Sequence, residues 1–177
     1  MEQNKTKGIY LYAMEYAIYM GLLLILKMIF SSFSGSFSII MGFIMLLLVV
    51  AVPVVGYVLT KRFRDESGYC SFSKIFLFGV MFYFFASLIS GIFDYVYYQY
   101  INPEFFQQQL SDIDILMQQM VEVGYISDQD MVAQLEAEKP HSPIAMVYQG
   151  MFGMIMIGTA YSLLLAIFLR KKKQKVE

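Results

Sequence analysis

The sequence has few charged residues and almost none of the residues that build metal or redox sites. Of its 177 residues, 15% are charged, one is cysteine, one is histidine and none is tryptophan. A single cysteine excludes a disulfide-stabilised scaffold. The near balance of 13 basic and 14 acidic residues argues against a nucleic-acid-binding module. Soluble domains carry roughly 25% charged residues, so a typical soluble enzyme is excluded as well.

The chain is instead rich in apolar side chains, with 58% hydrophobic and 17% aromatic residues. A soluble domain of this size could not cover that surplus with polar surface, whereas a membrane-crossing helix needs about 20 mainly apolar residues. We therefore predict an all-α polytopic membrane protein, with residues 1–177 forming a single membrane domain. Its four transmembrane helices are expected at about 9–30, 37–60, 75–101 and 144–169. The first is too long for the apolar region of a signal peptide and contains Glu15, so we interpret it as a span.

Lysine and arginine residues gather in three segments that four spans would place on one side of the membrane. The first residues, the connection between the second and third spans, and the C-terminal tail together hold 11 of the 13. The positive-inside rule therefore predicts that both termini are cytoplasmic. The tail anchors the last span in this interpretation, with specific binding of anionic lipid headgroups as the alternative. Its basic residues are Arg170, Lys171, Lys172, Lys173 and Lys175.

The long connection between the third and fourth spans, residues 102–143, is acidic and has the pattern of two helices. It holds eight of the 14 acidic residues and a single lysine. Pro103 suits the first turn of a helix, and Gly124 suits its end. Ser127 with Asp130 resembles a capping box that opens a second, shorter helix. We therefore predict an extracytoplasmic helical hairpin between spans three and four.

Apolar residues recur along the first helix of this hairpin at alternating spacings of four and three. Such a pattern makes one apolar stripe on a helix. The stripe must be buried against the second helix, the membrane surface, the outer ends of the spans or a partner, and we favour a partner. Its residues are Phe106, Leu110, Ile113, Met117 and Met120.

The hairpin does not carry a predicted metal or catalytic site. Its carboxylates come in pairs spaced by two residues, such as Asp112 with Asp114, and on a helix such side chains point about 200° apart. His141 has no second histidine or cysteine on its side of the membrane, as a zinc site would require. The chain also lacks a serine elbow, a phosphate loop and a zinc-protease motif. We expect no enzymatic activity, no metal and no cofactor.

Three ionisable residues lie inside the predicted spans, where such residues are functional candidates by default. Lys27 and Asp94 fall at the same predicted depth near the outer interface, which favours an ion pair; separate snorkelling to water is the alternative. Glu15 shares a helix face with Tyr12 and Tyr19. It is a structural acid in the preferred interpretation. In the alternative it exchanges protons, as the glutamate in the first span of small multidrug transporters does.

Small and polar residues line one side of the third and fourth predicted spans. The third has Tyr83 and Ser87 on this side, and the fourth has Gly158, Ser162 and Ala166 at four-residue spacing. Small residues at such spacing let helices approach closely. Helix packing is therefore the preferred interpretation, with a permeation path as the alternative.

Three short motifs follow one another in the middle of the chain. They are Arg64-Asp65-Glu66-Ser67-Gly68, then Ser71-Phe72-Ser73-Lys74-Ile75-Phe76, then Ile101-Asn102-Pro103-Glu104. With the acidic helix and the lysine-rich end after the last span, they make the chain resemble the bacterial membrane-protein family catalogued as domain of unknown function 4199. The resemblance implies a four-span inner-membrane protein with no established activity, and it transfers no functional residue.

Taken together, these patterns predict a non-enzymatic interaction or accessory protein of the bacterial inner membrane that uses its acidic outer hairpin. Its expected partners are the lipid bilayer and either another protein or further copies of itself, with no nucleic acid. The alternative is an oligomeric small transporter or channel component that uses Glu15 or Asp94 within the membrane.

Overall fold

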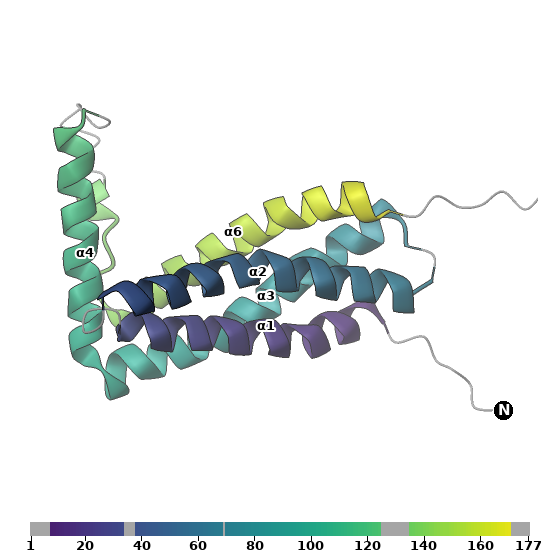
Figure 1. Cartoon of the computed structure of the whole chain (residues 1–177), viewed down its shortest axis with the longest axis horizontal. Coiled ribbons are helices and arrows are strands. Elements are labelled where there is room, and N and C mark those ends of the chain that lie inside the picture. The colour runs from purple at the N-terminus through teal and green to yellow at the C-terminus, as the bar shows by residue number, and fades with distance from the viewer. Residues whose placement is uncertain (1–7, 34–37, 69, 125–134, 171–177) are drawn as a thin grey trace, which may run out of the picture. The chain divides into compact units, whose positions relative to one another are not determined.

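A computed structural model of the chain describes residues 8–33, 38–68, 70–124 and 135–170, and nearly all of them are helical (Figure 1). The elements are α1 (Ile9–Ser32), α2 (Ser38–Glu66), α3 (Phe72–Val96), a π-helical turn η1 (Tyr97–Ile101), α4 (Pro103–Glu122) and α6 (Pro143–Leu169). No strand occurs within the described ranges. The predicted all-α class is confirmed.

Within the described residues, four helices are long and apolar enough to cross a membrane, in agreement with the four predicted spans. They are Ile9–Ser32, Gly42–Glu66, Phe72–Ile101 and Pro143–Leu169. The second runs six residues past its predicted end, because charged residues end a hydrophobic stretch without ending a helix. Arg62 and Glu66 even support its last turn as an ion pair of 2.8 Å. Gly68, with a φ of 71°, follows the helix end.

The chain divides into two compact units, residues 1–92 with 151–177 and residues 93–150. We call them the four-helix unit and the outer unit, and each is described by itself. The single membrane domain stays a prediction.

In the four-helix unit, α1, α2, α3 and α6 run side by side (Figure 1), and α3 is the most buried of them. Half of its apolar stretch is buried, against 28%, 11% and 28% for α1, α2 and α6. Phe78 of α3 stacks on Phe63 of α2 with ring centroids 4.0 Å apart and packs edge-on against Tyr16 of α1. On α6, Ser162 lies so close to Gly79 that a Cβ at this glycine would overlap its side chain. Therefore α3 contacts all three neighbours, and a small residue permits one of the contacts.

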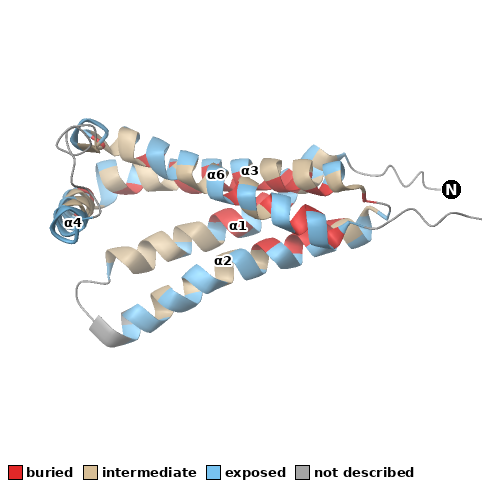
Figure 2. Cartoon of the chain, turned by 90° about the horizontal axis from the view of Figure 1, so that it is seen from above, coloured by how far each residue is buried: buried red, intermediate tan, exposed pale blue. Residues whose placement is uncertain are grey.

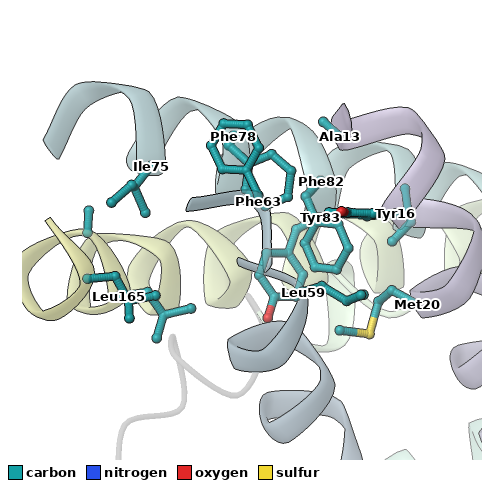
Figure 3. Packing of buried hydrophobic residues seen from close by; sticks show 14 of the residues in the cluster. Ala13, Tyr16, Met20, Leu59, Phe63, Ile75, Phe78, Phe82, Tyr83 and Leu165 are labelled. Carbon is teal, nitrogen blue, oxygen red and sulfur yellow. The ribbon is translucent and has the colours of Figure 1, made fainter. Parts of the chain in front are cut away.

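Buried residues gather toward one end of this unit (Figure 2). They begin at Ala13 and stop at Gly21 in α1, and they begin at Gly56 in α2. Every described side chain in 22–32 and 42–55 is half-buried or exposed. The resulting core contains stacked aromatic rings from α2 and α3 (Figure 3). Its members include Ala13, Tyr16, Met20, Leu59, Phe63, Ile75, Phe78, Phe82, Tyr83 and Leu165.

In the outer unit, a π-helical turn precedes α4. The amide of Asn102 donates to the carbonyl of Tyr97 at 2.8 Å, five residues back as in a π-helix. The Asn102 side chain then caps α4 by accepting from the amide of Phe105 at 3.1 Å. The helix begins at Pro103 as predicted, and Gly124, with a φ of 78°, follows its end. These two predicted boundaries are confirmed.

The second helix of the predicted hairpin falls largely on residues 125–134, outside the described residues. Its continuation at 135–137 is helical. The hairpin, and its placement outside the cytoplasm, stay predictions.

Candidate functional site

The predicted partner-binding stripe of α4 changes from buried to exposed along the helix. Phe106 is buried, with its ring 6.1 Å from that of Tyr98. Leu110, Ile113 and Met117 are half-buried, and Met120 is 49% exposed. Phe106 therefore stabilises the start of α4, and only the far end of the stripe is available to a partner.

Two further apolar residues extend this exposed end. Leu116 is 59% exposed and Val123 is 70% exposed, and with Met120 they follow the same four-three spacing, which places all three on one helix face. We call Leu116, Met120 and Val123 the outer strip. Asp112 lies one turn before Leu116 on this face and is exposed too. The sequence prediction missed Leu116 and Val123, although the signal, their spacing from Met120, was present.

The opposite side of α4 carries a groove of about 400 Å³. Its lining includes Asp114, Met117, Val121, Glu122, Glu136 and Lys139. The Lys139 ammonium lies 2.6 Å from an Asp114 carboxylate oxygen. This hydrogen bond raises the pKa of Lys139 above its ordinary value. The acidic side of α4 thus has a local cation, which the outer strip does not contain.

Across the part of the chain that the structure describes, no three histidine, cysteine or acidic residues are grouped so that they could hold a metal ion. His141 is exposed. Of the basic tail only Arg170 is described and it is exposed; Lys171, Lys172, Lys173 and Lys175 lie outside the described residues.

Glu15 is exposed on α1 and lines a groove between α1 and α3. The groove measures about 580 Å³, and its walls include Met14 and Ile18 of α1 with Phe85 and Leu88 of α3. A carboxylate on an otherwise apolar wall is unusual within a membrane-spanning helix.

Lys27 is half-buried in the four-helix unit, and Asp94 is half-buried in the outer unit. Because they belong to different units, their ion pair stays a prediction.

A polar cluster that the sequence did not indicate joins α1 to α2. The Tyr16 hydroxyl donates to a Glu66 carboxylate oxygen at 2.9 Å, and the Arg62 side chain donates to the other oxygen at 2.8 Å. The Arg62 guanidinium also lies 5.8 Å from the centre of the Tyr16 ring, within cation–π range. Arg62 and Glu66 lie in a helix end that was expected to be a connection, so their pairing with Tyr16 could not be predicted.

The small residues of the third and fourth spans meet at close helix contacts. A Cβ on Gly158 would overlap the ring of Tyr83. The hydroxyls of Ser87 and Ser162 donate to carbonyls of their own helices, at 2.9 and 2.6 Å. Packing therefore accounts for these positions without a polar path.

A protein-family model matches residues 15–171 of the chain, a range that includes α2, α3, α4, α6 and most of α1. No curated protein and no solved structure matches the chain. The match confirms the resemblance seen in the short motifs, and the chain belongs to the family described as "Protein of unknown function (DUF4199)".

Proposed function

We propose that this protein is a non-enzymatic interaction or accessory protein of the bacterial inner membrane, and that it binds a protein partner through the outer strip of α4. The observation that carries the proposal is the exposure of Leu116, Met120 and Val123, which ranges from 49% to 70%. Burying exposed apolar groups against a partner is favourable by about 25 cal/mol per Å² of apolar surface. Contiguous exposed apolar side chains therefore mark interaction surfaces.

The residues around the outer strip favour a protein over the lipid bilayer as its binding partner. Helix α4 is not among the four helices that are apolar enough to cross a membrane. Its carboxylates Glu104, Asp112, Asp114 and Glu122 are exposed, and they would oppose burial in the anionic surface of a bilayer.

The same charges define the chemistry of the partner. Since Asp112 borders the strip, the complementary surface carries apolar side chains next to lysine or arginine. An amphipathic helix with a basic edge has this chemistry.

The proposed orientation places both termini in the cytoplasm and α4 on the other side. It is supported by the segregation of charge, because basic residues lie at the end of α2, at the start of α3 and after α6, whereas the segment around α4 is acidic. The lysine-rich tail then meets the inner leaflet, where it anchors α6.

The test is quantitative co-purification from native membranes with the outer strip made polar. A triple variant, Leu116→Ser with Met120→Ser and Val123→Ser, is expected to lose its partner at least tenfold, since apolar anchors contribute roughly 1 kcal/mol or more each. The matched control changes two exposed polar residues of the same helix, Gln107→Ser and Gln108→Ser. It should keep the partner at the wild-type level.

Equal recovery of the same proteins by both variants would contradict the proposal. Copies of the chain with two different tags identify the alternative occupant, a second copy, by their mutual recovery. Circular dichroism of each purified variant checks that α4 remains folded.

A second candidate function is supported by the position of Glu15 in the groove between α1 and α3. In this candidate the protein is an oligomeric transporter or channel component that uses Glu15, with Asp94 as the other intramembrane acid. Proton-dependent flux in liposomes would be abolished by Glu15→Gln and unchanged by Glu104→Gln on α4. Absence of flux in the wild-type protein would exclude it.

A further inference from the structure

The groove between α1 and α3 of the four-helix unit carries one carboxylate among apolar side chains. It contains Glu15 and measures about 580 Å³, within the range of roughly 300–1,000 Å³ that ligand sites have. Its other lining residues are all apolar, and they are Leu11, Met14, Ile18, Phe85, Leu88 and Ile89. The groove therefore combines an apolar wall with a single charged group.

The two helices close the groove at one end and leave its side open. A Cβ on Gly21 would overlap the side chain of Ile89, so α1 and α3 are in contact there. Gly21 lies about one turn beyond Ile18 in α1. Leu11 and Ile18 are about half exposed, so the groove is open to the bilayer that surrounds the spans. A lipid chain can therefore enter it laterally.

The depth of Glu15 follows from its neighbour in the chain. Tyr16 donates a hydrogen bond from its hydroxyl to Glu66 at 2.9 Å, and Glu66 is the last residue of α2. The charged residues of α2 begin at Lys61, and charged side chains at the end of a span reach the membrane surface. Glu15 therefore lies near the lipid headgroups, and Ile18, one turn further along α1, lies deeper among the acyl chains.

The charge of Glu15 indicates the headgroup that fits this groove. A carboxylate on a lipid-facing surface is costly unless a cation accompanies it, and the cation that a bilayer itself supplies is the ammonium group of a phospholipid. A primary ammonium brings three donors, and hydrogen bonds between charged groups are the stronger ones. Glu15 has another interaction within the chain, but a carboxylate offers about four acceptor positions and so can accept from a lipid as well.

We propose that the groove binds a phospholipid with a primary ammonium headgroup, of the phosphatidylethanolamine type. Its ammonium donates to the Glu15 carboxylate, and one acyl chain lies along the apolar wall toward Gly21. The site is separate from the outer strip of α4 and does not depend on the partner proposed there. It does not depend on transport either, because it requires binding and no flux.

The test compares three phospholipids with identical dioleoyl chains and different headgroups, which are ethanolamine, choline and glycerol. Native mass spectrometry of the full-length protein in detergent gives the affinity for each added lipid. Wild-type protein should bind the ethanolamine lipid about tenfold more tightly than the choline lipid, because the quaternary ammonium of choline has no N–H to donate. The glycerol lipid, which is anionic and has no ammonium, should bind more weakly still.

Two variants and a matched control separate the charge from the apolar wall. Glu15→Gln should lower the affinity for the ethanolamine lipid to that for the choline lipid. The control Glu104→Gln removes an exposed carboxylate of α4 and should leave the tenfold preference unchanged. Ile18→Trp, which narrows the groove and retains Glu15, should weaken binding of the ethanolamine lipid at least tenfold. Both groove positions are exposed, so these variants should melt as the wild type does.

Equal affinity of the wild-type protein for the ethanolamine and choline lipids would overturn the proposal, as would a preference that survives Glu15→Gln. A second copy of the chain is the alternative occupant of this face. It would be detected as the mass of a dimer that is lost in Ile18→Trp, and that result would overturn the proposal as well.

Discussion

Helices α2 and α4 both expose large apolar side chains, but their surroundings differ. On α2, Ile40, Phe43 and Leu47 are 66–72% exposed, and the helix has no charged residue before Lys61. On α4, Leu116 and Val123 are exposed to a similar degree, among four exposed carboxylates. Lipid can cover the first surface, whereas the second needs a partner that tolerates charge. Exposure therefore identifies a binding surface only where neighbouring charges exclude lipid.

The largest expected effect is a loss of stability. Comparing a core variant with a variant on the exposed face of α2 tests whether lipid alone covers that face. Phe78→Ala in the core should lower the free energy of unfolding by about 3–5 kcal/mol, because a large cavity replaces the ring. Phe43→Ala, at a position 66% exposed, should change it by no more than about 0.5 kcal/mol. Denaturation of the purified variants in micelles provides the measurement. Equal losses would mean that protein covers α2.

A matched pair of arginine substitutions tests the comparison directly. Leu47→Arg places a charge in the apolar stretch of α2, at a cost of about 2.5–3.5 kcal/mol for membrane insertion. Leu116→Arg, at a position 59% exposed on α4, should not affect insertion. The membrane-integrated fraction of newly made protein measures both. The comparison fails if Leu116→Arg lowers integration as much as Leu47→Arg does.

The smallest effect concerns the acidic side of α4. The hydrogen bond from Lys139 to Asp114 raises the pKa of Lys139 above 10.5, so Asp114→Asn should return it toward that value. The exposed Asp112→Asn should leave it unchanged. NMR titration of labelled lysines gives the pKa.

The sign of the stability effect follows from the raised pKa. The ion pair stabilises the outer unit below the ordinary pKa of lysine, and this contribution disappears as the pH rises through the raised value. If Asp114→Asn left the pKa of Lys139 unchanged, Lys139 would not be paired with Asp114. The groove beside α4 would then lack its local cation.

Most of the helices could be predicted because membrane spans need long apolar stretches, which can be recognised in the amino-acid sequence. The end of α2 could not be predicted, since the residues from Lys61 to Glu66 are charged except for Phe63, yet they are compatible with a helix. The start of α4 followed from Pro103, but the π-helical turn before it leaves no comparable sequence pattern. Its only local sign is Asn102, a residue that caps helices and also occurs in turns.

The candidate sites were less predictable, because they depend on which helices meet. The spacing of Met120 already placed it on an apolar stripe that needs a covering surface, but it did not show that Phe106 at the other end is buried against Tyr98. Tyr83 and Gly158 were predicted to lie on the sides of their helices that pack together. The groove that contains Glu15 needs α1 and α3 together, and no periodicity within one helix records such a meeting.

Photo-crosslinking in native membranes tests the central claim, that the outer strip meets a protein while α2 meets lipid. A photoreactive residue replaces Leu116 in one variant and Leu47 in another. The account predicts a discrete protein adduct from position 116, lost when Met120 and Val123 are changed to serine, and lipid adducts from position 47. Lipid adducts from position 116, or a protein adduct that survives the serine changes, would contradict it.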